Sequence, residues 1–140
     1  MKVKSVKSVN KKEKQVTKIA TDIMAKALSQ KITKEQFESA QQVIAEELAY
    51  HWLQKKGYKT LLKNYESPLG EVSLIAKDDG VLVFIWVNKY VNEKVATYYL
   101  KRYGINKMPT RFEIVSVSLV KDSEPVISIK YSQYLFDRVS

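Results

Sequence analysis

Two apolar segments separated by a tight turn constrain the fold of this chain more than any other feature. Residues 70–77 and 81–88 flank Asp78-Asp79-Gly80, and an Asp-Gly pair between two strand-like runs is a strong hairpin signal. Residues 81–87 are apolar without interruption, which is the pattern of a strand that is covered on both faces. The sequence therefore predicts a central strand at 81–88, in a sheet against which helices pack.

Helix signals precede this hairpin, and further helix and strand signals follow it. Apolar residues recur at helical spacing from Val16 to Leu28 and predict a helix at about 14–30. Thr33 and Gln36 form a capping box, so a second helix should begin there and run to about Lys56, before Gly57. The other predicted elements are a strand at 58–64, a helix at 93–102 capped by Asn92, strands at 111–120 and 125–131, and a helical turn at 134–138.

The order of these elements predicts the fold class. A helix, three strands, a helix and two strands make an α/β fold with a mixed central sheet flanked by helices. We expect a basic flexible tail at 1–12, an N-terminal helical extension at 13–40 and an α/β domain at 41–140. The tail holds too few apolar side chains to offset the entropy of ordering a lysine-rich segment.

Composition excludes several kinds of protein. The 140 residues include no cysteine, which rules out disulfides, thiolate zinc sites and a cysteine nucleophile. No apolar run reaches about 18 residues, so we expect no membrane-spanning helix and no membrane partner. The basic start of the chain lacks the apolar stretch of a signal peptide. These features predict a cytoplasmic protein.

The net charge of +9 is concentrated at the N-terminus. Residues 1–18 carry seven lysines and one acid, and thus +6 of the total. A basic arm of this kind commonly touches nucleic acid, an acidic protein or lipid, but it is equally typical of a solvated terminus. The lysines of this arm that we assign to nucleic-acid binding are Lys2, Lys4, Lys7, Lys11 and Lys12.

Residues 70–76 read Gly-Glu-Val-Ser-Leu-Ile-Ala, and residues 84–88 read Phe-Ile-Trp-Val-Asn. Glu46-x-x-Ala49 precedes this frame, and Arg111-Phe112-Glu113 follows it. The chain resembles the YraN-type family of predicted endonucleases, whose pattern is Gly-Glu-Ile-Asp-Leu-Ile-Ala and then Phe-Val-Glu-Val-Lys. The resemblance covers about residues 45–136. It implies a restriction-endonuclease-like core, related to Holliday-junction resolvases, in which the Asp, Glu and Lys of the pattern hold a divalent metal ion beside a phosphate.

The three catalytic positions of that pattern are exchanged in this chain. Ser73 stands where the family has Asp, Trp86 where it has Glu, and Asn88 where it has Lys. Mg²⁺ needs clustered carboxylate oxygens, and neither serine nor tryptophan supplies them. Glu66 also replaces an Arg of the family, and the loop after Asn88 is shorter than is usual there. The sequence therefore predicts a degenerate site without catalytic or metal-binding residues.

Two acids of the family survive, Glu46 and Glu71. Glu46 is either a residual outer metal ligand or a helix-surface glutamate, and Glu71 is either a remnant of the site or a polar residue at the start of a strand. Trp86 has two candidate roles, stacking on a base or filling the vacated metal pocket. Because Trp86 and Asn88 are two residues apart on a predicted strand, we expect them on one face, converging with Ser73 in one pocket.

These observations predict a catalytically inactive nuclease-fold protein that binds DNA, RNA or a nucleoprotein partner and needs no cofactor. Lys101 and Arg102 lie among Tyr98, Tyr99 and Tyr103, a mixture typical both of nucleic-acid surfaces and of amphipathic helices. One alternative is a protein-interaction module or homodimer that uses the vacated pocket. A second alternative is a Mg²⁺-dependent endonuclease with relocated carboxylates, drawn from Glu46, Glu71, Asp78 and Asp79.

Overall fold

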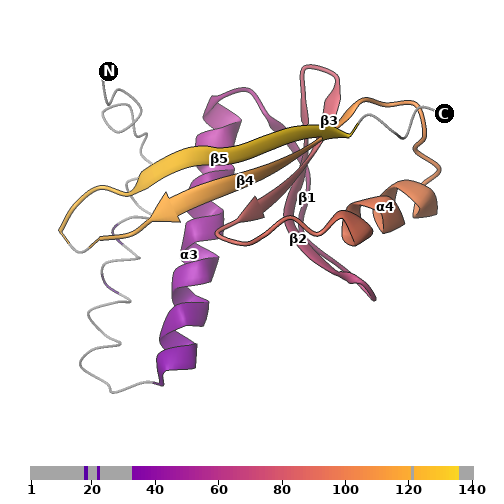
Figure 1. Cartoon of the computed structure of the whole chain (residues 1–140). Helices are drawn as coiled ribbons and strands as arrows, with labels where there is room; N and C mark the ends of the chain where they lie inside the picture. The colour runs from indigo at the N-terminus through magenta and orange to yellow at the C-terminus, as the bar shows by residue number, and fades with distance from the viewer. Residues whose placement is uncertain (1–17, 19–21, 23–32, 121, 136–140) are drawn as a thin grey trace.

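The computed structural model describes residues 18, 22, 33–120 and 122–135, and Figure 1 shows the chain. Within residues 33–135 the chain forms two helices and five strands. In chain order these are α3 (Lys34–Lys55), β1 (Lys59–Ser67), β2 (Gly70–Asp78), β3 (Val81–Val87), α4 (Glu93–Arg102), β4 (Thr110–Ser118) and β5 (Val126–Leu135).

The five strands form one mixed sheet in the order β1-β2-β3-β4-β5. Neighbouring strands are antiparallel except β3 and β4, which are parallel and are joined through α4. A parallel pair needs a crossover connection of this kind, whereas antiparallel pairs need only tight turns. The central position of β3, predicted from its apolar run, is confirmed.

The sheet lies between two apolar cores, one on each face. Val83, Ile85 and Val87 point into the core shared with α3, which we call the α3-side core. Leu82, Phe84 and Trp86 point into the core shared with α4, the α4-side core. All six side chains are buried, because alternate residues of a strand face opposite sides and both sides are covered. The α/β fold with helices flanking a mixed sheet is thus confirmed.

The predicted helix ends are confirmed in detail. The Thr33 hydroxyl accepts a hydrogen bond from the Gln36 N–H at 3.0 Å, and the Gln36 side chain accepts one from the Thr33 N–H at 2.9 Å. Gly57 follows α3 with a φ of 102°, a left-handed conformation that favours glycine. The Asn92 side chain caps α4 by accepting from the Lys94 N–H at 3.2 Å. These local signals set where each helix begins and ends.

One predicted element is wrong. Tyr134 and Leu135, assigned to a last helical turn, belong to β5, where they pair with Arg111 and Thr110 of β4. The ladder to β4 supplies backbone partners that a single helical turn would lack, so pairing overrides the local pattern. The remainder of that turn, the predicted helix at 14–30 and the tail at 1–12 lie outside the described residues.

Two further predictions concern the chain as a whole. The domain boundary placed at residue 40 lies inside α3, which is continuous from Lys34 to Lys55. Among the described residues, no helix has the length and apolar character needed to cross a membrane.

Candidate functional site

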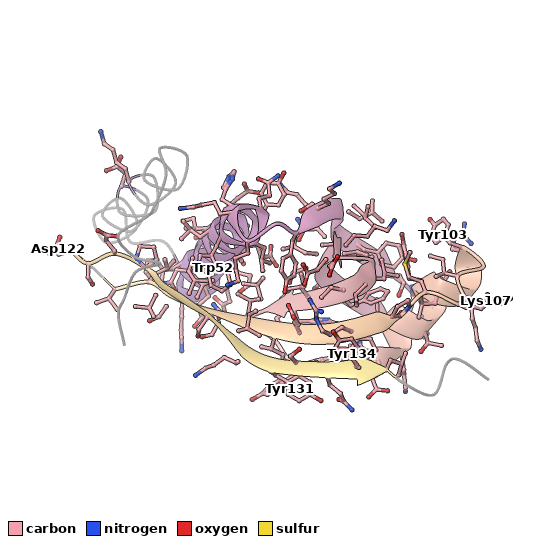
Figure 2. All side chains as sticks on the ribbon, turned by 90° about the horizontal axis from the view of Figure 1, so that it is seen from above. Trp52, Tyr103, Lys107, Asp122, Tyr131 and Tyr134 are labelled. Carbon is pink, nitrogen blue, oxygen red and sulfur yellow. The ribbon has the colours of Figure 1, made fainter. Side chains whose placement is uncertain are left out.

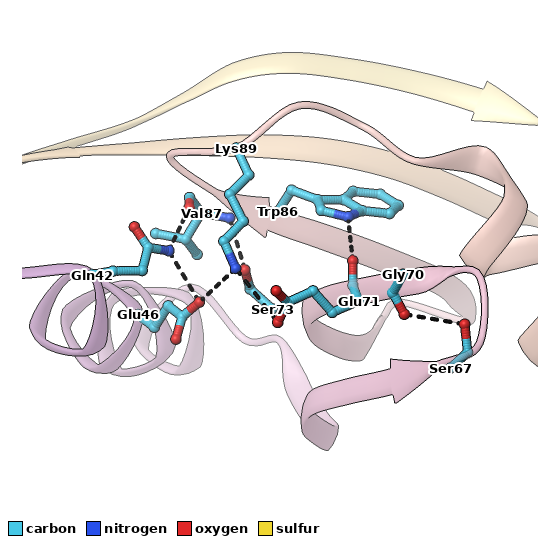
Figure 3. Close-up of polar contacts among 9 residues, drawn as sticks. All are labelled: Gln42, Glu46, Ser67, Gly70, Glu71, Ser73, Trp86, Val87 and Lys89. Carbon is cyan, nitrogen blue, oxygen red and sulfur yellow. Dashed lines mark hydrogen bonds and ion pairs between the residues drawn. The ribbon is translucent and has the colours of Figure 1, made fainter. Parts of the chain in front are cut away.

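Two of the acids that match the family pattern meet at one lysine that lies just beyond the end of β3. The Lys89 ammonium lies 3.5 Å from a carboxylate oxygen of Glu46 and 3.7 Å from one of Glu71. The Glu46 side chain is only 14% exposed, while those of Lys89 and Glu71 are 30% and 54% exposed. Figure 3 shows Lys89 reaching down between the two carboxylates. We call this group the Lys89 cluster.

The α3 helix holds Glu46 in place through its neighbour one turn earlier. The Gln42 side-chain amide donates to Glu46 at 3.0 Å and to the Val87 carbonyl at 2.8 Å. The same amide therefore ties α3 to the end of β3 (Figure 3). Glu46 is thus a partly buried, hydrogen-bonded residue beside the end of the central strand β3 and not a solvated residue of the helix surface.

Ser73 closes the end of β3 from the other side. Its hydroxyl accepts a hydrogen bond from the Val87 N–H at 3.1 Å, in a position where the Ser73 side chain is buried. Strict alternation is broken here, since Val72 packs in the α4-side core and Leu74 in the α3-side core. Ser73 therefore acts as a structural link between β2 and β3, and its hydroxyl oxygen is engaged by the backbone.

The start of β2 and the start of α4 approach each other closely at Gly70, the residue before Glu71. Gly70 has a φ of 131°, and a Cβ added to it would lie 2.6 Å from the Asn92 side-chain nitrogen. That nitrogen donates to the Leu69 carbonyl at 3.1 Å. Only glycine fits such a position, both for its backbone conformation and for the space it leaves. The Gly-Glu pair of the family frame thus sets where Glu71 enters the site.

Asn88 and Trp86 do not share a face, contrary to the prediction. Asn88 has a φ of 55°, so the alternation of β3 ends there. Its side chain turns to β4, accepting from the Val117 N–H at 2.9 Å and donating to the Val117 carbonyl at 3.0 Å. A turn in the left-handed region redirects the residues that follow, which is how Lys89 comes to face Glu46 and Glu71.

Trp86 is buried in the α4-side core and is 1% exposed. Its indole N–H donates to the Glu71 carbonyl at 3.0 Å, and its ring meets Phe112 edge-to-face with centroids 5.9 Å apart. The expected convergence of Ser73, Trp86 and Asn88 in one pocket is therefore wrong. Trp86 is a core residue in this structure, and its ring is not available to stack on a base.

These groups do not fit the divalent metal ion that the YraN-type pattern implies. Glu46 and Glu71 are the only carboxylates of the cluster, and the ammonium between them already neutralises one negative charge. Mg²⁺ prefers several oxygen ligands in near-octahedral geometry, and the two other matched side chains, Trp86 and Asn88, point elsewhere. Across the described residues, no three His, Cys, Asp or Glu side chains gather in a way that could hold a metal ion.

The carboxylates considered for a relocated site lie at opposite ends of β2. Glu71 is at its start, and Asp78 is at its end, about 23 Å away for an extended chain. Asp78 is bound instead to Arg111, with 2.8 Å between carboxylate oxygen and guanidinium nitrogen. Asp79 lies in the turn that follows, with a φ of 51°. Glu46, Glu71, Asp78 and Asp79 thus do not form one site.

Arg111 is the centre of a second polar group, which we call the Arg111 cluster. Its guanidinium donates to Glu113 at 2.7 Å and to the Tyr58 hydroxyl at 3.0 Å. The Tyr58 hydroxyl also donates to Glu113 at 3.0 Å. A further guanidinium nitrogen donates to the Tyr134 hydroxyl at 3.2 Å. Arg111, Glu113 and Tyr58 are all buried, and together with Asp78 they occupy the opposite end of the sheet from Lys89.

Burial and charge shift two pKa values in the Arg111 cluster. Burial raises the pKa of Tyr58 above its ordinary value of 10.0, and the charge and hydrogen bond of Glu113 raise it further. Burial alone lowers the pKa of Arg111, but its hydrogen bonds to Asp78 and Tyr134 and the charge of Glu113 more than offset this. Arg111 therefore stays charged and Tyr58 neutral throughout the physiological range.

Two of the residues assigned to nucleic-acid binding are described, and both are exposed. Lys101 and Arg102 form the last turn of α4, and they make no ion pair with any described residue. Lys2, Lys4, Lys7, Lys11 and Lys12 lie outside the described residues. Of the chain's 24 bases and 15 acids, 14 and 13 fall within the described residues, so most of the excess positive charge belongs to the remainder.

Comparison with known proteins assigns the family. A family model described as "Uncharacterised protein family UPF0102" matches residues 45–93. This range includes Glu46, Glu71, Ser73 and Lys89. A UPF0102 protein of Thermodesulfovibrio yellowstonii is 31% identical over 90 residues, covering 52% of this chain and 80% of that protein. The chain belongs to the UPF0102 family. The resemblance to YraN-type proteins is thereby confirmed, and the sheet and helices agree with a restriction-endonuclease-like core.

Two other UPF0102 proteins extend this comparison. One from Clostridioides difficile is 31% identical over 94 residues, covering 54% of this chain and 82% of its own length. One from Koribacter versatilis is 33% identical over 110 residues, covering 64% of this chain and 76% of its own.

Lys89 is not predicted by the family pattern, although it follows that pattern directly. The position that matches the family's lysine holds Asn88, and the pattern assigns no role to the residue after it. The signal that would have found Lys89 is Asn88 itself, since asparagine is one of the few side chains that enter the left-handed region readily. An Asn-Lys pair at the end of a buried strand indicates a change of face before the lysine.

Proposed function

We propose that this UPF0102 protein is a cytoplasmic, catalytically inactive member of the nuclease-like fold that binds nucleic acid, or a nucleoprotein partner, without cutting it. The observation that carries the proposal is the position of Lys89 between Glu46 and Glu71. The lysine ammonium neutralises the carboxylates as a metal ion would, but it cannot activate water for attack on a phosphodiester as a metal ion does. The exchanged side chains at 73, 86 and 88 support the same conclusion.

The binding half of the proposal rests on charge. The basic N-terminal arm and the exposed cations of α4 supply contacts to phosphates, and such contacts weaken as salt rises because they release bound counterions. Bases and acids nearly balance in the described residues, whereas residues 1–18 carry a net charge of +6. Most of the non-specific affinity for nucleic acid should therefore depend on residues 1–18.

Cleavage and binding are tested separately. Purified full-length protein is incubated with DNA and RNA in Mg²⁺ or Mn²⁺, and we expect no cleavage. Metal-dependent cleavage that disappears in Glu46→Gln or Glu71→Gln would defeat the proposal. Binding is measured by titration at two salt concentrations, with the full chain and with residues 1–18 removed. Salt-sensitive binding that is weaker, but not lost, after truncation is the expected result, and no binding by either form would refute it.

A second candidate function, homodimerisation, is favoured by the outer edge of β5. Within the described sheet β5 pairs only with β4, so its other edge has no strand beside it. Val126 and Tyr131 are 57% and 41% exposed there, and Lys130 is the only charged residue of the strand. Long edges with so few charges pair readily with another chain. Sedimentation equilibrium of the full chain tests this, with Tyr131→Lys expected to dissociate any dimer that forms through β5.

A further inference from the structure

The end of α4 and the turn after it line an open pocket at a distance from the Lys89 cluster. The pocket measures about 490 Å³ and is lined by Thr97, Leu100 and Lys101 of α4, by Ile105 and Asn106 of the turn, and by Leu135 at the end of β5. Its wall is mainly apolar, with a hydroxyl, an amide and an ammonium at its rim. It lies at the opposite end of α4 from Asn92, about 15 Å along the helix.

The charged side chains around this pocket are all positive. Residues 94–112 contain five bases and no acid, and of these only Arg111 is buried. Lys101, Arg102 and Lys107 are exposed and form no ion pair with any described residue. Figure 2 shows Lys107 and Tyr103 together at this end of the molecule. An anionic ligand is therefore favoured at the rim, whereas the wall favours an apolar or aromatic group.

Tyr103 precedes Gly104, which also lines the pocket, and adds a held aromatic surface at this end of α4. Its ring packs on Tyr99 with centroids 4.8 Å apart, yet 56% of the residue is exposed. Tyr99 is in turn fixed by edge-to-face contacts with Tyr65 and Phe84. A ring that is already held loses little entropy when a flat group stacks on it. An exposed aromatic side chain among cations is the arrangement found in single-strand binding sites.

We propose that this α4 pocket binds a single-stranded segment of nucleic acid, with one unstacked base in the pocket, a neighbouring base on Tyr103, and the backbone phosphates on Lys101, Arg102 and Lys107. This inference rests on the proposed nucleic-acid-binding function and goes beyond it by naming the strand state and the surface. A duplex does not fit, because its bases are stacked and paired and cannot enter a pocket without being extruded. The Asn106 amide and the Thr97 hydroxyl supply polar contacts for a base edge.

Fluorescence anisotropy with the full-length protein tests this proposal. The probes are a labelled 12-nucleotide oligo(dT) and a labelled 12-base-pair duplex. The wild type should bind the single strand about tenfold or more tightly than the duplex, and Tyr103→Ala should weaken single-strand binding by about tenfold, the effect of losing one stacked base. Lys101→Glu should weaken it at least as much.

Lys94→Glu is the matched control. Lys94 lies on the same helix two turns before Lys101, is exposed, and does not line the pocket, so both variants change the net charge by the same amount. Both should weaken duplex binding equally, but only Lys101→Glu should remove the preference for a single strand. Thermal melting of all three variants checks that they are folded. Photocrosslinking with an oligonucleotide that carries 5-iodouracil should place the adduct between residues 97 and 107.

The possible outcomes separate the two proposals. If the wild type binds single strand and duplex equally, or if Lys101→Glu and Tyr103→Ala behave like Lys94→Glu, the pocket proposal is overturned and the proposed function stands. If the wild type binds neither probe, nor the same two probes made of RNA, both proposals are overturned. Binding of a labelled Leu/Glu peptide that Lys101→Glu abolishes, without oligonucleotide binding, would identify an acidic protein segment as the ligand and overturn the pocket proposal.

Discussion

A group of one base and two acids lies near each end of β3: the Arg111 cluster and the Lys89 cluster. The two clusters differ in their distances and in their exposure to solvent. The Arg111 cluster has donor–acceptor distances of 2.7 and 2.8 Å to Glu113 and Asp78, and the Arg111 and Glu113 side chains are 9% and 3% exposed. The Lys89 cluster has distances of 3.5 and 3.7 Å, with side chains up to 54% exposed. Arg111 is held by a rigid fork of hydrogen bonds, whereas Lys89 is a point charge on a flexible stem.

This difference assigns different roles to two groups of similar composition. The Tyr58 hydroxyl, the Arg111 guanidinium and the Glu113 carboxylate all have close partners, so the cluster ties the connection between α3 and β1 to β2, β4 and β5 at that end. The Lys89 cluster is open and loosely paired, so its partners can be exchanged at little cost. The first holds the fold together, and the second is a loosely paired group of charges at the end of β3.

The largest effect should follow from removing Arg111. Arg111→Met leaves Glu113 buried without its counter-charge, which should lower the free energy of unfolding by about 3–5 kcal/mol. Urea denaturation followed by circular dichroism measures this. Arg111→Lys is the control, since it keeps the charge but not the fork, and its effect should be clearly smaller. A loss below 1 kcal/mol for Arg111→Met would remove the basis of the comparison.

Tyr58 should make the stability of the protein fall at alkaline pH. Its folded pKa is raised above its ordinary value of 10.0, so above about pH 10 the unfolded chain releases a proton that the folded chain retains. The stabilisation is fully present below pH 10 and is lost as pH rises towards the folded pKa. Tyr58→Phe should cost about 1–3 kcal/mol at pH 7 and flatten the decline above pH 10. A decline of unchanged steepness in Tyr58→Phe would assign it to other groups.

Removing Lys89 should have the smallest effect on stability. Its pairs are long and partly exposed, so Lys89→Met should change the free energy of unfolding by less than about 1 kcal/mol. Urea denaturation at low and high salt tests this, because added salt should remove the difference in free energy of unfolding between the wild type and Lys89→Met. A loss as large as that of Arg111→Met would show that the two clusters contribute equally to the free energy of unfolding.

Signals carried by neighbouring residues were sufficient to predict most of the fold. The Thr33–Gln36 capping box, the Asn92 cap and the uninterrupted apolar run of β3 each depend on a local pattern, and each was predicted from it. The full length of β5 was not predicted, because its last residues are held by pairing with β4 rather than by their own pattern. The Arg111 cluster was missed for a similar reason, since its members come from parts of the chain up to 76 residues apart.

The candidate site was predicted only in part. Its retained acids, Glu46 and Glu71, were identified from the family pattern, and both lie at the site. The positions of Trp86 and Asn88 were wrong because a period of two residues holds only while the backbone stays extended, and a φ of 55° at Asn88 ends it. Asn88 is in the left-handed region, and the cation that meets Glu46 and Glu71 is Lys89, one residue after it.

Manganese binding tests the central claim, that the Lys89 ammonium occupies the place of a cation between Glu46 and Glu71. Isothermal titration with Mn²⁺ compares the wild type, the double variant Ser73→Asp with Lys89→Met, and that double variant with Glu46→Gln added. We predict no saturable binding by the wild type, one saturable site in the double variant, and loss of that site when Glu46 is neutralised, because three carboxylates without a competing ammonium make a hard-cation site. One stoichiometric Mn²⁺ bound by the wild type and lost in Glu46→Gln alone would contradict the account.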